Sequence, residues 1–187
     1  GGIANINFHV MVGKPSADQS KNGFGKKRGI CGIALEIVDG GTLENVNVSD
    51  ITITGTESPI FVRLPNRARG YYEGQVIDSI GKLRDVSLSN IRITDAGSYG
   101  CSITGLPGHP VENITLDNIL LSHEGGGKNC PVPTDEKEKE YPEATMWGPF
   151  PAKGFFVHHA RNIKFNNVEI RTTSPDERPD YVKADVE

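Results

Sequence analysis

A basic and aromatic cluster between residues 63 and 72 is the part of this 187-residue sequence best suited to binding chemistry. Arg63, Arg67 and Arg69 are followed at once by Tyr71 and Tyr72. The planar guanidinium of arginine can bind both oxygens of a carboxylate, and a tyrosine ring offers a face on which a sugar can stack. The cluster therefore predicts contact with an acidic sugar. The alternative is structural, with Arg63 paired to a neighbour and the other two arginines solvated.

Glu36 is the acidic residue that we expect to join this cluster. It alternates with the apolar residues Leu35 and Ile37, so it points to the opposite face of a strand. On that face we expect it to meet Arg63 of the next strand, either in a ligand groove or in a salt bridge. A lone carboxylate does not supply both an acid and a base for hydrolysis, so no catalytic residue is assigned.

The histidines and cysteines predict neither a metal site nor a cofactor. His158 and His159 are adjacent in a strand-like segment, where neighbouring side chains point to opposite faces, so their rings are not expected to hold one ion. His109 lies in a tight turn, where a structural hydrogen bond is the expected role. The cysteines are odd in number and widely spaced, unlike a disulfide framework or a zinc site; they are Cys31, Cys101 and Cys130.

Short strands of an internal repeat must position these residues. Four segments share a template in which an apolar pair, a polar corner and a second apolar pair follow one another: residues 43–54, 83–94, 111–122 and 160–171. A degenerate copy begins at Ile3. Strict alternation within each pair indicates strands with one buried face. The predicted inward pairs are Val46/Val48, Ile51/Ile53, Val86/Leu88, Ile91/Ile93, Ile114/Leu116, Ile119/Leu121, Ile163/Phe165 and Val168/Ile170.

Asn or Asp recurs at two corner positions of each copy. Both residue types tolerate a left-handed backbone and hydrogen-bond their own main chain, which suits a sharp bend. Because short strands bent in this way can wind into coils that pair in parallel, we predict an all-β fold, a right-handed parallel β-helix. A β-sandwich is the alternative, but it would show hairpin turns and no recurring corner. The predicted corners are Asn45, Asp50, Asp85, Asn90, Asn113, Asn118, Asn162 and Asn167.

One domain is predicted over residues 1–187, with its longest loop at about residues 124–153. That loop is rich in Pro and Gly, so we expect a functional or protective flap. The formal net charge of −4 argues against nucleic acid as a partner, because a phosphate backbone attracts a basic surface. No apolar run approaches the roughly 18 residues needed to cross a bilayer, so no membrane partner is predicted.

The first coil of the predicted stack has no evident cap. About four apolar side chains left open to water there would cost roughly 6–12 kcal/mol, comparable with the ~5–15 kcal/mol stability of a whole domain. Residues 9–28, a second copy of the chain or further upstream coils could cover them. Because Gly, Lys and Ser dominate residues 13–28, we favour a homodimer through this N-terminal coil.

Five long segments carry a resemblance to a known family. They are residues 34–41, 61–70, 104–111, 146–156 and 178–187, so the resemblance extends over nearly the whole chain. Together they resemble the C-terminal region of glycoside hydrolase family 28, the polygalacturonase-like pectin-degrading enzymes, and most closely a bacterial branch. The resemblance implies a single-stranded, pectin-lyase-like β-helix and an acidic polysaccharide or oligosaccharide as partner. It also implies an extracellular or periplasmic location, although no signal-peptide pattern opens the sequence.

The same resemblance implies a catalytic machinery that these residues lack. Members of the family hydrolyse O-glycosyl bonds with inversion, using carboxyl groups held around one water. The carboxyl groups belong to Asn-Thr-Asp and Asp-Asp motifs, which Gly-His-Gly and Arg-Ile-Lys motifs follow, and none of the four occurs in this sequence. We therefore expect the isolated chain to be inactive. The alternative is a non-catalytic β-helix module that binds acidic polysaccharide or assembles with itself.

Overall fold

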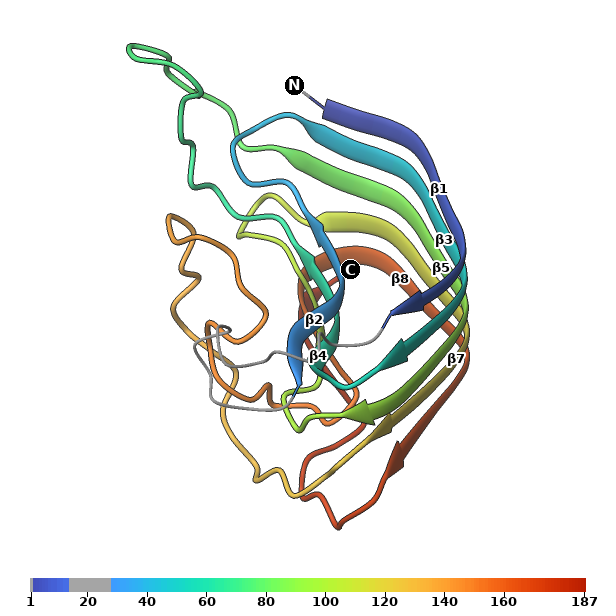
Figure 1. The fold of residues 1–187 in the computed structure, drawn as a ribbon. Coiled ribbons are helices and arrows are strands. Elements are labelled where there is room, and N and C mark those ends of the chain that lie inside the picture. Colours follow the sequence, from blue (N-terminus) through green and yellow to red (C-terminus); the bar gives the residue numbers. More distant parts are fainter. Residues whose placement is uncertain (1, 14–27) are drawn as a thin grey trace.

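The computed structural model describes residues 2–13 and 28–187 of the chain. These residues are all-β, with nine strands in one sheet that curls like half of a barrel (Figure 1). Every pairing between these strands is parallel. The described residues form no helix, and hence none long and apolar enough to cross a membrane.

Two arms of strands meet in this sheet. Long strands form the first arm, in the order β1 (Gly2–Gly13), β3 (Thr42–Thr54), β5 (Lys82–Ala96) and β7 (Val111–His123). Shorter strands form the second arm, in the order β2 (Gly29–Glu36), β4 (Thr56–Arg63) and β6 (Cys101–Thr104). The arms are joined by β8 (Phe155–Thr172), whose first residues pair with β6 and whose later residues pair with β7. The last strand, β9 (Tyr181–Val186), pairs with β8.

The Asn and Asp corners bend the long strands as predicted. All eight predicted corners have a left-handed backbone, with φ between 47° and 58°. Their side chains also bond from strand to strand, since Asn113 Nδ2 donates to Asp85 Oδ1 at 2.7 Å and Asn162 Nδ2 donates to Asn113 Oδ1 at 2.9 Å. A second ladder joins the other corners, namely Asp50, Asn90, Asn118 and Asn167. The corner residues therefore supply both the bend and a polar contact between neighbouring strands.

Apolar side chains of the long strands fill the inside of the curl. The predicted pairs of β3, β5 and β7 are all buried, with an exposure of 5% or less. The pairs of β8 are only half-buried, because β9 pairs with the beginning of β8 and leaves its later residues at an edge. Burying one such side chain stabilises the fold by about 1.5–3 kcal/mol, so this core is its main source of stability.

The segment between β7 and β8, residues 124–154, packs on the outer face of the short-strand arm (yellow and orange in Figure 1). Phe150 and Ala152 of this segment form a second apolar cluster with Phe61 of β4 and Phe156 of β8. The rings of Phe150 and Phe156 stack with their centroids 5.8 Å apart. As a result β4 is buried along its whole length. The predicted flap is thus a packed cover, which we call the covering segment.

Candidate functional site

Two of the predicted binding residues lie in one row across the short-strand arm. Glu36 of β2 is the register partner of Arg63 at the end of β4. Arg63 is in turn the partner of Thr104 in β6, and Thr104 is the partner of His158 in β8. Register partners point to the same face of a parallel sheet. Because Arg63 follows Phe61 by two residues, this face is the outer one, beneath the covering segment.

Arg63 is buried beneath the covering segment and has 0% exposure. Its Nη1 donates to the carbonyl oxygen of Gly105 at 2.9 Å, and its Nη2 donates to the carbonyl oxygen of Glu136. The guanidinium also lies 4.8 Å from the ring centroid of Trp147. Burial lowers the pKa of Arg63 to about 10, an effect that nearby Glu136 and Glu138 oppose. The predicted sugar contact of Arg63 is therefore corrected, because this side chain has no exposed surface and anchors the covering segment instead.

Glu36 is half-buried at the other end of the row. Loss of contact with water raises the pKa of its carboxyl group to about 7. Within the described residues no salt bridge joins it to Arg63, whose guanidinium bonds to main-chain carbonyls. The predicted salt bridge is therefore absent, although the two residues are neighbours in the sheet.

Arg67 anchors the loop that follows β4, residues 64–81, which projects from the body of the molecule (Figure 1). Its Nε donates to Asp39 Oδ1 at 3.0 Å, and its Nη2 donates to Asp39 Oδ2. The same Asp39 Oδ1 accepts the backbone N–H of Arg69 at 2.8 Å. The hydrogen bond from Arg67 is the main reason that the pKa of Asp39 lies below its ordinary value. The Arg67 guanidinium also lies 5.4 Å from the ring centroid of Tyr141, so its binding surface is largely occupied.

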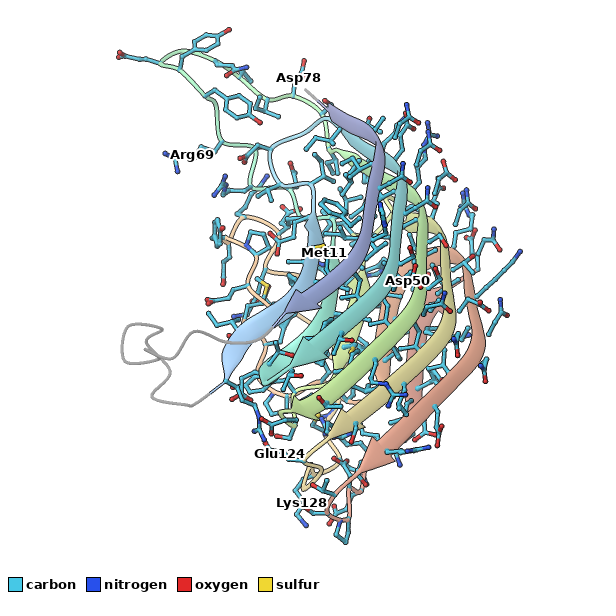
Figure 2. The ribbon with its side chains drawn as sticks, turned by 45° about the vertical axis from the view of Figure 1, so that its right-hand side comes forward. Met11, Asp50, Arg69, Asp78, Glu124 and Lys128 are labelled. Carbon is cyan, nitrogen blue, oxygen red and sulfur yellow. The ribbon has the colours of Figure 1, made fainter. Side chains whose placement is uncertain are left out.

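The remaining predicted residues of this loop face solvent. Tyr71 is 75% exposed and Tyr72 is 70% exposed. Arg69 is exposed on the same loop, away from the sheet (Figure 2). Within the described part of the chain its guanidinium makes no hydrogen bond or ion pair, in contrast to those of Arg63 and Arg67. Of the three predicted arginines, Arg69 is thus the one that can receive a carboxylate.

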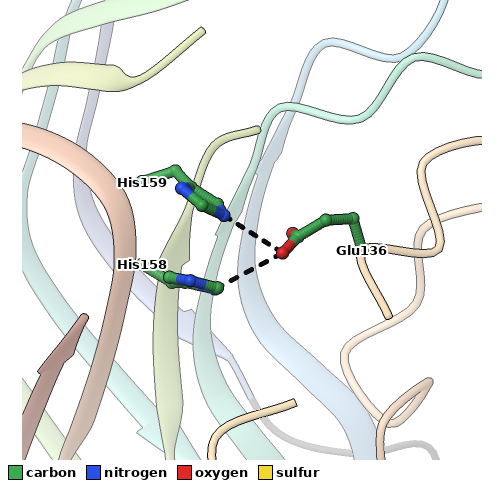
Figure 3. A group of neighbouring side chains, drawn as sticks. All are labelled: Glu136, His158 and His159. Atoms are coloured by element: carbon green, nitrogen blue, oxygen red, sulfur yellow. Dashed lines mark hydrogen bonds and ion pairs between the residues drawn. The ribbon is translucent and has the colours of Figure 1, made fainter. Parts of the chain in front are cut away.

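A second polar cluster, which sequence reasoning missed, extends the row beyond Arg63. We call it the His–carboxylate cluster; it consists of Glu136, His158, His159 and Asp185 (Figure 3 shows the first three). The two imidazole rings stack with their centroids 3.7 Å apart and their planes at 25°. Glu136 Oε1 lies 3.0 Å from His159 Nε2 and 3.8 Å from His158 Nδ1. On the other side of the ring, His159 Nδ1 lies 2.5 Å from Asp185 Oδ2.

The backbone at His159 explains why both rings lie on one side. Its φ of 49° is left-handed, so the alternation of side chains in an extended strand is broken at this residue. The prediction that His158 and His159 point to opposite faces is therefore wrong. Asp185 of β9 has the same φ of 49° and follows Ala184, the register partner of His158. His159 and Asp185 thus form a third set of corners, at which the two side chains lie against each other.

The sequence contains a signal for the corner at His159, but it contains none for Glu136, the partner of His159 from the covering segment. His159 directly precedes the repeat copy that begins at Ala160, and histidine is enriched with Asn and Asp in left-handed conformations. Glu136 lies in an irregular segment without periodicity, so its place could not be deduced.

The two imidazoles and Glu136 of the His–carboxylate cluster are mostly shielded from water, whereas the side chain of Asp185 is 65% exposed. The side chains of His158, His159 and Glu136 are 13%, 10% and 23% exposed. Burial lowers the pKa of His158, the neighbouring His159 lowers it further, and Glu136 and Asp185 oppose both effects. Such a set of imidazoles and carboxylates can transfer protons or bind a cation.

Comparison of the chain with models of protein families, with curated proteins and with solved structures gave no match. Function must therefore be inferred from the geometry and from the resemblance in the sequence.

Proposed function

We propose that this chain is a homologue of the polygalacturonase-like glycoside hydrolases of family 28 and that its curled sheet is a right-handed parallel β-helix. The register of the long-strand arm supports a stack of coils, since Val46 of β3 pairs with Val86 of β5, which pairs with Ile114 of β7. Left-handed Asn and Asp corners at equivalent positions support the same stack. The chain then acts in pectin or polyuronide metabolism, in an extracellular or periplasmic location.

The role that the geometry supports best is binding of an acidic polysaccharide or oligosaccharide. The single observation that carries it is the anchored loop on which Arg69, Tyr71 and Tyr72 are exposed. Asp39 and Arg67 hold the base of this loop, so less conformational freedom is lost when a ligand binds. A free guanidinium matches the carboxylate of a uronic acid, and exposed tyrosine rings match the apolar faces of the sugar.

Binding should be measured by titrating galacturonate oligomers into the wild-type chain and into Arg69→Ala and Tyr71→Ala. Loss of one charge-assisted contact or one stacking ring should weaken binding about tenfold, which corresponds to about 1.4 kcal/mol. Arg92→Ala is the matched control, because Arg92 is exposed on β5 outside the loop. Equal affinity of all four proteins would remove the loop from the binding site.

Cleavage is not expected of the isolated chain. Inverting hydrolysis uses two carboxyl groups about 6.5–9.5 Å apart, and the four family motifs that supply this machinery are absent from the sequence. Glu36, with its pKa of about 7, is a single carboxyl group among the predicted binding residues. Incubation with polygalacturonate should release no reducing ends above a buffer blank. Release that Glu36→Gln abolishes would contradict this expectation.

A second role, self-association, is favoured by the apolar edge at β1 and β2. These strands are the two ends of the strand order, and Ile3, Phe8 and Met11 of β1 are 56%, 42% and 50% exposed. A cavity of about 410 Å³ lies against this edge, lined mainly by apolar side chains such as Phe8, Met11 and Ile33. We propose a homodimer through this edge. Light scattering after size-exclusion chromatography should give twice the 20.3 kDa chain mass, and Met11→Asp should shift the protein to monomer.

A further inference from the structure

Three potential ligand atoms of the His–carboxylate cluster converge within 4.8 Å of one another. They come from Glu136 of the covering segment and from His158 and His159 of β8. We propose that this cluster binds one divalent transition-metal ion, with Zn²⁺ the best suited, through Glu136 Oε1, His158 Nδ1 and His159 Nε2. The site is separate from the exposed loop at Arg69 and does not depend on sugar binding.

Asp185 supplies the second feature expected of a histidine metal site. Histidines that bind metals usually donate their other ring N–H to a carboxylate, which fixes the tautomer and the orientation of the ring. His159 Nδ1 lies 2.5 Å from Asp185 Oδ2, so its Nε2 is left for the ion, on the side of Glu136. An ion at Nε2 would replace the present contact between His159 and Glu136 and would be shared by both.

The donor set selects among ions. Two imidazoles and one carboxylate suit Zn²⁺, Co²⁺ or Ni²⁺, whereas Mg²⁺ and Ca²⁺ prefer sites made of oxygen ligands. The guanidinium of Arg63 is close enough to lower the pKa of His158, and its positive charge opposes a cation. Two carboxylates, those of Glu136 and Asp185, offset this charge. Three protein ligands also leave a fourth position of a tetrahedral zinc ion for water.

Reaching this geometry requires one of the stacked rings to rotate. The imidazole planes are 25° apart, so the lone pairs of the two rings are not yet aimed at one point. His158 must rotate, and it is the less constrained ring, since its ion-pair distance to Glu136 is 3.8 Å against 3.0 Å for His159. A cavity of about 170 Å³, lined in part by His159 and Asp185, borders the cluster on the side of Asp185.

An ion bound in this way would connect three parts of the chain. Glu136 belongs to the covering segment, the histidines to β8, and Asp185 to β9. The ion would therefore fasten the cover and the last strand to the sheet, and it should raise the melting temperature of the protein.

Isothermal titration of the chelator-treated full chain with Zn²⁺ tests this proposal. We expect one equivalent to bind, with at least a tenfold loss of affinity in Glu136→Gln and His158→Asn and about a 10–100-fold loss in Asp185→Asn. Glu138→Gln and His109→Asn are matched controls from the same segment and from an exposed turn, and both should bind as wild type. Circular dichroism should report the same fold for every variant.

X-ray absorption of the zinc-loaded wild-type chain gives a test that needs no variant. The spectrum should contain imidazole scattering from two histidines together with oxygen ligands. Failure of the wild-type chain to bind Zn²⁺, undiminished binding by Glu136→Gln, or a spectrum without imidazole would each overturn the site. An equal loss of binding in His109→Asn would assign the ion to the protein surface and would also overturn the proposed site.

Discussion

Two arginines six positions apart have opposite environments in this molecule. Arg63 ends β4 beneath the covering segment and donates to the main-chain carbonyls of Gly105 and Glu136. Arg69 lies on the projecting loop, where its guanidinium is exposed. The same residue type thus holds the fold together in one region and is available to a ligand in the other. The difference is set by the covering segment, which packs over Arg63 and contacts the base of the loop at Asn66 and Arg67 but leaves Arg69 exposed.

The largest effect should come from Arg63→Ala. The change leaves one buried and one partly buried carbonyl group without their donor and opens a cavity beside Trp147, so it should lower the free energy of unfolding by about 3–4 kcal/mol. Urea denaturation followed by circular dichroism gives this value. Arg92→Ala on the surface of β5 should change it by less than about 0.5 kcal/mol. Similar small values for both variants would mean that Arg63 is no anchor.

Arg67→Ala should have an intermediate effect, and it should change both the stability of the fold and the binding of a ligand at the loop. Arg67 and Asp39 border solvent, so screening limits the loss of stability to about 1 kcal/mol. The base of the loop would loosen, and galacturonate oligomers should bind several-fold more weakly even though Arg69 is intact. Calorimetric titration of the variant measures this effect. Wild-type affinity in Arg67→Ala would show that the anchor does not organise the loop.

A smaller effect is expected in the pH dependence of stability, through Glu36. Its pKa is raised from 4.5 to about 7 in the folded protein, so the folded state holds this proton more tightly than the unfolded state. The contribution to stability is therefore complete below about pH 4.5, falls as the pH rises to about 7, and is constant above it. After allowance for solvent screening, the decline should be about 1 kcal/mol.

Glu36→Gln removes the titrating group and should flatten this part of the profile. Denaturation of both proteins at a series of pH values gives the comparison. A decline of the same size in Glu36→Gln would assign it to another group.

The two regions also differ in how far the sequence predicts them. The corners at Asn and Asp and the alternating apolar pairs follow from local chemistry, and the structure has them at the expected positions. The exposure of Tyr71 and Tyr72 likewise follows from a loop between two strands. The burial of Arg63 does not, because the residues that cover it lie some 70 positions later in an irregular segment. The rings of His158 and His159 lie together because the backbone at His159 is left-handed. The rule of alternating side chains, which assumes an extended strand, does not predict this.

Mapping the amide chemical shifts of the full chain during titration with galacturonate oligomers shows whether the projecting loop binds the sugar. We expect the shifts to concentrate in the loop of residues 64–81, around Arg69, Tyr71 and Tyr72. The amides of His158 and His159 should stay unchanged, because these residues belong to β8 beneath the covering segment and not to the loop. The absence of shifts in the loop, or shifts centred on the buried residues, would contradict this expectation.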